Sequence, residues 1–293
     1  MKKIFIIIPV YNRREETRKC ILSLNQQTYK DFSLIVFDDG STDKTDLMLK
    51  EEFGHVRVLK GDGNYFWSKS VNQAVVFALD NKADYILTLN NDLVLDEYFV
   101  ESFVNKAIER PDIIMGSSCY DIKTGKIIFA GSRMNWRTAK LRMELEFLNM
   151  DDLKDTLIEV DHLGGRGLWI PADVFKKIGL FNEKDFPHYI ADYDFTLRAK
   201  KAGFGVYCNI ESKIYSNDIK KTTIRENVLL SKRYSKNLII YLSSIKSPAN
   251  LKIRWKFAVK NCPKRNLFYF IILDTLKVLG SYVRYLSSAN KCK

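Results

Sequence analysis

The chain has 293 residues, of which 46% are hydrophobic, and it carries five cysteines and a formal net charge of +12. This length is enough to bury a full α/β core with one smaller appendage. The cysteines show no C-x-x-C spacing, which fits incidental thiols in a reducing cytoplasm. We find no signal peptide and no stretch approaching the ~20 apolar residues of a membrane-spanning helix. These features exclude a disulfide scaffold and predict a cytoplasmic protein.

Two apolar runs near the N-terminus predict parallel strands joined by a helix. Residues 4–8 are apolar and lead into Pro9, and residues 34–37 lead into the acidic turn DDGSTD at 38–43. Strand, helix, strand is the beginning of a parallel sheet with right-handed crossovers. Neither G-x-G-x-x-G nor G-x-x-x-x-G-K-[ST] is present, so phosphates must be held by metal and side chains.

The stretch ILTLNNDLVLD, residues 86–96, runs a third buried-strand pattern into Asn90, Asn91 and Asp92. Ligands of open α/β sheets bind at the carboxyl ends of strands, and carboxylate and amide oxygens suit a hard cation that holds a diphosphate. Asp92 is therefore the candidate metal ligand. On these residues alone, an ordinary Asn-Asn-Asp turn is an equally good interpretation.

Five motifs in this order carry a family resemblance: PVYNRREE, DDGSTD, residues 63–72, NND and FPHYIADYDFTLRA. Together they resemble the inverting glycosyltransferases of family 2, over about three quarters of the chain. The resemblance implies a GT-A fold, which is an α/β architecture with a single Rossmann-like, mostly parallel central sheet flanked by helices. It also implies a nucleotide-diphosphate-sugar donor.

The resemblance assigns roles to residues of the motifs PVYNRREE, DDGSTD and NND. Asp92 would bind the Mg²⁺ or Mn²⁺ ion on the donor diphosphate. Asn91 stands where relatives often have an acidic residue, and would contact the ribose or the metal. The pocket for the base and ribose would be lined by Pro9, Tyr11, Asp38 and Asp39.

The loop and helix start at 61–76 depart from the family pattern. Relatives carry glycines between the asparagines that match Asn64 and Asn72, whereas FWSK occupies that interval here. We expect a polar loop leading into a helix, which presents backbone N–H groups and Lys69 to the donor phosphates. Trp67 either stacks on the base or donor sugar, or packs the loop onto the sheet.

The catalytic half follows a polar segment, 119–161, which we interpret as a variable loop and a pair of strands near the acceptor side. Glycines then surround Arg166, at 164, 165 and 167, ahead of a helix from about Ala172. Glycines such as Gly165 admit a ligand close to the backbone, and a guanidinium suits a diphosphate or sugar hydroxyl. A tight turn with a solvated arginine is the alternative.

The motif FPHYIADYDFTLRA supplies the catalytic base that the resemblance implies, which is Asp192. An inverting transfer needs a carboxylate that takes the proton of the acceptor hydroxyl, and Asp194 is the competing candidate. Ala191 replaces a Glu found in many relatives, so positioning would fall to His188 or Tyr189. An N-cap role for Asp192 on a helix at 193–202 is compatible with catalysis.

A second metal ligand is left open by the sequence. Relatives often place a His after the next strand, where this chain has Ser216, Asn217 and Asp218. None of the three histidines lies at that place. Asp218 or water would complete the coordination shell.

Positive charge is concentrated at the C-terminal end. Residues 219–293 hold 17 Lys and Arg against two acids, giving +15, while the rest carries −3. We therefore divide the chain into a catalytic domain, 1–218, and a basic helical extension, 219–293. Basic helices with aromatic side chains favour an anionic membrane surface, with Lys252, Arg254, Lys256 and Lys260 as lipid-facing cations. The alternatives are a packed flank or homodimer contact, and nucleic acid, which no base-reading module supports.

These patterns predict a metal-dependent inverting glycosyltransferase. It would move a hexosyl or deoxyhexosyl group from a UDP- or dTDP-sugar to a hydroxyl of a lipid-linked cell-surface glycan, at the inner face of the bacterial plasma membrane. A nucleotidyltransferase that forms sugar nucleotides is one alternative, but PVYNRREE lacks the Gly-rich basic loop that it needs. A catalytically silent sugar-binding subunit is the other, supported by Asn91, Ala191 and the missing His.

Overall fold

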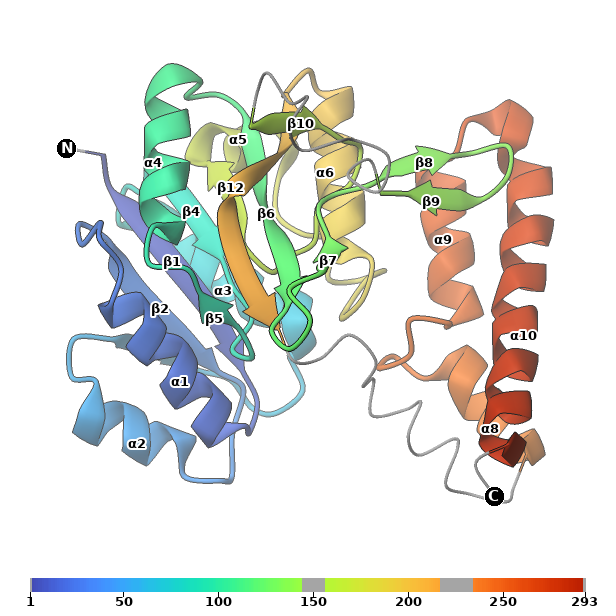
Figure 1. The fold of residues 1–293 in the computed structure, drawn as a ribbon, viewed down its shortest axis with the longest axis horizontal. Coiled ribbons are helices and arrows are strands. Elements are labelled where there is room, and N and C mark those ends of the chain that lie inside the picture. The colour runs from blue at the N-terminus through green and yellow to red at the C-terminus, as the bar shows by residue number, and fades with distance from the viewer. Residues whose placement is uncertain (1, 144–155, 217–233, 292–293) are drawn as a thin grey trace.

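The apolar runs at the N-terminus form the parallel half of a central sheet (Figure 1). The computed structural model describes residues 2–143, 156–216 and 234–291, and over these residues the sheet has ten strands. Its elements run in the following chain order: β1 (Ile4–Val10), α1 (Arg14–Asn25), β2 (Ser33–Asp38), α2 (Thr45–Glu52), β3 (Arg57–Lys60), α3 (Phe66–Asp80), β4 (Tyr85–Thr88), β5 (Val94–Leu95), α4 (Phe99–Glu109), β6 (Ile114–Asp121), β7 (Ile127–Phe129), β8 (Arg133–Asn135), β9 (Lys140–Arg142), β10 (Leu157–Glu159), β11 (Leu168–Pro171), α5 (Ala172–Ile178), α6 (Ala191–Lys201), β12 (Val206–Ser216), α8 (Tyr234–Ser243), α9 (Leu251–Asn261), the 3-10 turn η3 (Lys264–Asn266) and α10 (Leu267–Lys291).

The strand order places the three predicted motif-bearing strands side by side. The order is β10-β12-β6-β11-β4-β1-β2-β3, with β5 paired to β12 and β7 to β6. Strands β4, β1, β2 and β3 are mutually parallel, so the turns after β1, β2 and β4 share one edge of the sheet. Strand β11 runs antiparallel to β4 and brings the glycine-rich turn before it to the same edge.

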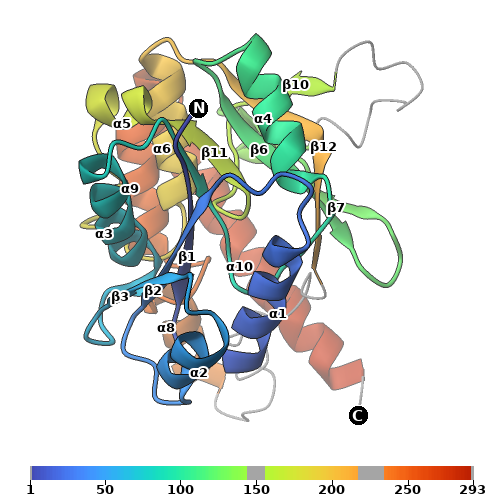
Figure 2. The ribbon, with the colours of Figure 1, turned by 90° about the vertical axis from the view of Figure 1, so that its left-hand side faces the viewer.

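Both faces of the sheet are covered by helices, as the continuous apolar strands require. Alternate residues of β1 face opposite sides: Ile6 packs with α1, α2 and α4, and Ile7 packs with α3, α5 and α6. Figure 2 shows α1 and α4 on one side of the sheet, with α3, α6 and α9 on the other. These layers confirm the predicted α/β class with a central, mostly parallel sheet flanked by helices.

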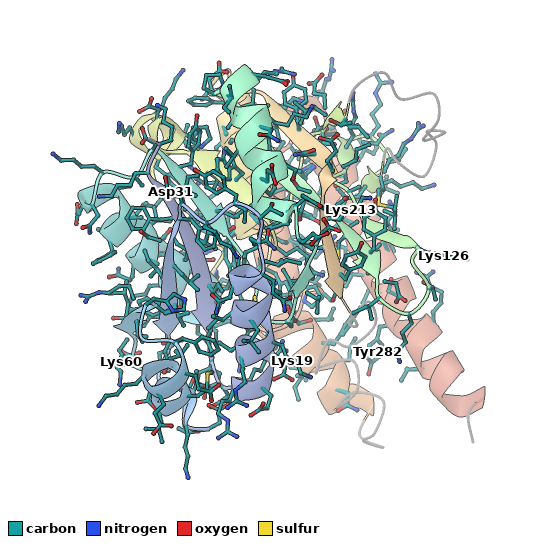
Figure 3. The ribbon with its side chains drawn as sticks, turned by 60° about the vertical axis from the view of Figure 1, so that its left-hand side comes forward. Lys19, Asp31, Lys60, Lys126, Lys213 and Tyr282 are labelled. Carbon is teal, nitrogen blue, oxygen red and sulfur yellow. The ribbon has the colours of Figure 1, made fainter. Side chains whose placement is uncertain are left out.

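The C-terminal helices are joined to the catalytic region through α9. Ile253 and Phe257 belong to the main core, and Asn261 Nδ2 donates to Asp194 Oδ1 at 2.9 Å. Helix α8 packs on α10 through Tyr241 and Tyr282, whose ring centroids lie 5.3 Å apart; Figure 3 labels Tyr282. Helix α9 is therefore a structural layer of the catalytic region. The proposed boundary at 218/219 adjoins a segment outside the described residues.

Charges on α9 that the sequence predicts to be lipid-facing have protein partners instead. Arg254 forms an ion pair with Asp274 of α10. The Nζ atoms of Lys256 and Lys260 lie 2.6 and 3.1 Å from the carboxylate of Asp185. These three cations therefore have carboxylate partners from other segments of the chain, which the sequence alone does not indicate. Lys252 and Lys260 are exposed, whereas Arg254 and Lys256 are partly buried.

Helix α10 is apolar over a longer stretch than the sequence predicts. Within the described residues, Lys264–Arg284 is long and apolar enough to cross a membrane by length and composition, and 22% of its most apolar window is buried. The expectation that no stretch approaches this length is therefore wrong. Asp274 and Lys277 interrupt the run, which is why it reads as two short apolar segments.

Candidate active site

The turn after β1 projects Tyr11 and Arg13 into the site. Asn12 and Arg13 have φ angles of 56° and 65°, in the left-handed region. The acidic turn after β2 supports this conformation: Thr42 N donates to Asn12 Oδ1 at 2.9 Å, and Asp43 Oδ2 accepts from the backbone N–H of residue 14 at 2.8 Å. Tyr11 remains 49% exposed and available for a ligand, while Pro9 is partly buried.

Asp38 and Asp39 lie at the end of β2, as predicted, and both are buried. Asp38 Oδ1 accepts from the backbone N–H of Ser41 at 3.0 Å. The carboxylate of Asp39 accepts from the backbone N–H groups of Gly63, Tyr65 and Phe66, at 3.0, 2.9 and 3.1 Å. Asp39 therefore holds the loop at 61–66 and the start of α3 against β2.

The remaining polar residues of this loop and helix differ in their exposure and in their partners. Asn64 is exposed, and Lys69 Nζ lies 3.6 Å from the centroid of the Tyr65 ring. Asn72 is buried, and its amide binds both backbone groups of Phe181 and the carboxylate of Glu183. The structure thus turns Asn72 toward the segment between α5 and α6, away from the edge where the strands end.

Trp67 connects three parts of the site. Its Nε1 donates to Asn90 Oδ1 at 3.2 Å, and its ring meets Phe181 edge-on with centroids 5.3 Å apart. A Cβ atom on Gly165 would lie 2.3 Å from the Trp67 ring, so only glycine fits there. These contacts favour the packing interpretation of Trp67, with the glycine-rich turn resting on its ring.

Asp92 is held by an arginine that the sequence interpretation left without a role. Arg13 Nη1 lies 2.9 Å from Asp92 Oδ2, and the two side chains are 47% and 25% exposed. Asn91 is buried and donates from Nδ2 to Thr17 Oγ1 of α1 at 2.9 Å. The guanidinium therefore neutralises the carboxylate predicted to bind metal.

The donor set around Asp92 fits an ion that is held mainly by a bound diphosphate. Over the described residues, no group of three or more His, Cys, Asp or Glu is arranged to hold a metal. Ser216 lies buried at the end of β12, and the candidates Asn217 and Asp218 fall outside the described residues. One carboxylate with phosphate oxygens and water suits Mg²⁺ or Mn²⁺.

Asp192 is positioned by backbone groups in the first turn of α6. Its Oδ2 accepts from Gly165 N at 2.8 Å and its Oδ1 from Tyr193 N at 3.0 Å. Helix α6 begins at Ala191, two residues earlier than predicted, after Ile190 in a left-handed conformation. Burial raises the pKa of Asp192 above its ordinary value, against the opposing effects of these N–H groups and of Arg166. A carboxylate in this state is a stronger base than an exposed one.

Asp194 has structural partners on both oxygens. Oδ2 lies 2.8 Å from Arg198 Nε and Oδ1 accepts from Asn261 of α9. With its side chain 2% exposed, Asp194 joins α6 to α9. The carboxylate of Asp194 is thus bound by side chains on both oxygens, whereas that of Asp192 is bound by backbone N–H groups.

Arg166 and His188 are the next two predicted site residues. The charge of Arg166 favours ionised Asp192, and its backbone oxygen accepts from Ser117 Oγ at 2.9 Å. Burial lowers the pKa of His188 to about 4, helped by the positive charges of Lys246 and Arg13. His188 is therefore neutral at physiological pH. The sequence interpretation missed Lys246, since no local motif marks it.

The fold and these side chains define a glycosyltransferase. Residues 5–169, more than half of the chain, match the family described as Glycosyl transferase family 2. The chain belongs to this family.

The relatives in this comparison are named as glycosyltransferases. An uncharacterized glycosyltransferase of Rickettsia typhi is 29% identical over 232 residues, which is 75% of this chain and 67% of that protein. GlyA of Streptococcus pneumoniae, named a glycosyltransferase, is 33% identical over 39% of this chain, but over only 16% of its own length. The poly(ribitol-phosphate) beta-N-acetylglucosaminyltransferase TarP of Staphylococcus aureus is 32% identical over 40% of this chain and 36% of its own.

Solved structures share the fold across the whole chain. The S. aureus protein TarS, residues 1–349, has a TM-score of 0.59 at 16% identity and covers 100% of this chain and 92% of its own. The mannosyltransferase PcManGT of Pyrobaculum calidifontis, solved with GDP-Man and Mn²⁺, has a TM-score of 0.60 at 12% identity, covering 99% and 75%. The predicted GT-A fold is confirmed.

Proposed function

We propose that this protein is an inverting glycosyltransferase that moves a sugar from a UDP- or dTDP-sugar to a hydroxyl of a cell-surface glycan. One observation carries the proposal. Asp192, a carboxylate whose pKa is raised by burial, is anchored by Gly165 in the turn that rests on Trp67, and Trp67 also binds the segment leading to Asp92. Trp67 thus connects the proposed base, Asp192, with the proposed diphosphate site at Asp92.

Asp192 would act as the general base. The acceptor oxygen attacks the anomeric carbon while its proton passes to Asp192, and the bond from that carbon to the diphosphate oxygen breaks with its electron pair. Backbone N–H groups hold both carboxylate oxygens, so the base is fixed before the acceptor arrives. Attack opposite the leaving group inverts the anomeric centre.

A divalent ion would be held by Asp92, with Asn91 beside it, and would supply positive charge to the leaving diphosphate. Structures with this fold that contain Mn²⁺, such as PcManGT, support a divalent ion. With an ion on Asp92, the Arg13 guanidinium that now pairs with this carboxylate would be available to bind the diphosphate. The positive charge of Arg166 favours the ionised form of Asp192 that this mechanism requires.

The acceptor is proposed to be an anionic or lipid-linked envelope glycan. The name of TarP, a poly(ribitol-phosphate) transferase, supports a phosphate-bearing acceptor. A hollow of about 400 Å³ lies between the β8–β9 hairpin and η3, which precedes α10, and four arginines line it: Arg133, Arg137, Arg142 and Arg265.

The same end of α10 supports attachment to the cytoplasmic face of the membrane. Phe268 and Tyr269 are 71% and 66% exposed, directly after the arginine hollow. Exposed aromatic side chains beside basic ones are typical of proteins that lie on an anionic bilayer.

The test is transfer and donor hydrolysis with a panel of UDP-, dTDP- and GDP-sugars, with Mg²⁺ or Mn²⁺ and with EDTA. We expect release of UDP or dTDP that depends on metal and on Asp192. No turnover of any donor, with binding retained, would favour a silent sugar-binding subunit instead. The anomeric configuration of the product, measured by NMR, tests inversion.

A further inference from the structure

The turn between α8 and α9 reaches the donor side of the site from the C-terminal helices. Lys246, in this turn, places its Nζ 5.7 Å from the centroid of the Tyr11 ring. Tyr11 follows β1 at the strand-end edge where the diphosphate site lies. A lysine from the end of the chain therefore stands over a ring from its beginning.

The position of Lys246 is fixed by a hydrogen-bonded turn. Asn250 donates from Nδ2 to the backbone oxygens of Ser243 and Ser244, at 2.7 and 3.1 Å, and its Oδ1 accepts from Ile253 N at 3.1 Å as the N-cap of α9. Ser247 is buried and donates to the backbone oxygen of Tyr241 at 2.5 Å. The turn is held on both sides of residue 246, while the lysine side chain itself stays exposed.

The base of this turn is attached to the catalytic centre. Helix α9 begins directly after it, and its last residue, Asn261, binds Asp194 in the same helix turn as Asp192. The backbone of Lys246 is therefore fixed relative to the helix that carries the proposed base. The position of its Nζ then depends mainly on the side-chain rotamer of Lys246.

The charges around Lys246 favour an anionic ligand. The positive charges of Lys246 and Arg13 both help to lower the pKa of His188, so positive potential from both residues reaches this buried ring. Asp92 already pairs with Arg13. No ion pair of Lys246 with a carboxylate occurs in the described part of the chain, whereas its neighbours Lys256 and Lys260 share Asp185.

We propose that Lys246 binds the diphosphate of the sugar nucleotide, so that the C-terminal helices complete the donor site. This inference rests on the proposed function and adds a residue to it. When the base or ribose occupies the face of Tyr11, the ammonium group must leave the ring. The diphosphate beside Arg13 is the anion within reach of its flexible stem. The role is substrate binding, with no proton transfer.

The test measures binding of UDP, dTDP and the parent nucleosides by titration calorimetry to the full chain, with metal present. Lys246→Ala should weaken binding of the diphosphates about tenfold, the effect of losing one charge-assisted contact. Nucleoside affinity should change little. Lys246→Arg should recover most of the diphosphate affinity, and Lys252→Ala, an exposed lysine on α9, is the matched control.

Two negative results have different meanings. If the wild-type protein binds no nucleoside diphosphate, both the proposed function and this inference are wrong. If the wild type binds UDP or dTDP and Lys246→Ala binds it equally well, only the inference is overturned. An equal loss of nucleoside and diphosphate affinity would also overturn it, because Lys246 would then support Tyr11 and the base pocket.

Discussion

Replacing Asp192 and Asp194 separately by Asn tests the assignment of the base. The two carboxylates are two residues apart in α6 but have different surroundings: Asp192 binds two backbone N–H groups, and Asp194 binds Arg198 and Asn261. Asp192→Asn should lower kcat by about 10²- to 10⁴-fold, or about 3 to 5 kcal/mol in the barrier. Its donor affinity should stay near that of the wild type.

Thermal stability should fall more for Asp194→Asn than for Asp192→Asn. Asp194→Asn removes the negative charge that pairs with Arg198, and its new amide N–H faces either Arg198 or Asn261. The free energy of unfolding should fall by about 2 kcal/mol. For a chain of this size the melting temperature should fall by about 4 to 8 °C. The Arg198 guanidinium keeps its bonds to the backbone oxygens of Ile178 and Leu180, so the helix should remain folded.

The pH dependence of Asp192 gives a second readout. Its folded-state pKa is raised, so the stability it contributes is fully present below the ordinary value of 3.8 and is lost as pH rises through the raised pKa. At neutral pH the buried charge is therefore destabilising. Asp192→Asn should melt no lower than the wild type there, although it is inactive.

The pH dependence of kcat reports on the ionisation of Asp192 directly. The wild-type kcat should fall on acidification at a pH above the range of an ordinary Asp, because Asp192 must be ionised to act. His188, with a pKa of about 4, titrates nearby, so His188→Gln serves as the control and should keep this acid limb. An inactive, stable Asp194→Asn protein beside an active Asp192→Asn protein would refute the reasoning and move the base two residues along α6.

Three further variants test other parts of the structure. Asp92→Asn should abolish metal-dependent donor binding and transfer while the protein stays folded, and full wild-type activity in excess EDTA would rule out its metal role. Asp185→Asn removes the partner of two partly exposed lysines on α9 and should lower stability by about 1 kcal/mol, measured by urea unfolding. Replacing Phe268 and Tyr269 by Ser should weaken co-sedimentation with phosphatidylglycerol vesicles at low salt, while Ile108→Ser, 76% exposed on α4, should not; equal binding of the wild type to neutral vesicles would reject membrane attachment.

The strand ends of the site could be predicted from the sequence because they are local. An apolar run followed by Asp38, or by Asn90 and Asp92, marks both the strand and the edge where it ends. Parallel pairing then brings those ends together without further information. The order of the sheet and the antiparallel entry of β11 have no such local mark.

The contacts of single charged residues could not be predicted in this way. Lys256 and Lys260 look like solvated cations in the sequence, and the Asp185 that binds them lies in another part of the chain. Trp67 was open to two interpretations because its neighbour Gly165 comes almost a hundred residues later, after five more strands of the sheet. Helix boundaries were also displaced, since Ile190 starts α6 by a left-handed turn that no residue preference indicates.

The Arg13–Asp92 ion pair links metal and donor binding through charge. Without ligands, the guanidinium compensates the carboxylate, so Asp92 is not left as an unpaired negative charge at the edge of the sheet. Under the proposed function, a divalent ion on Asp92 would displace Arg13, and the displaced cation would gain a partner only if a diphosphate were bound. Each ligand would then offset the cost of breaking the pair for the other, so their binding would be mutually favourable. Lys246, in the turn between α8 and α9, would add positive charge on the proposed donor side without depending on the metal.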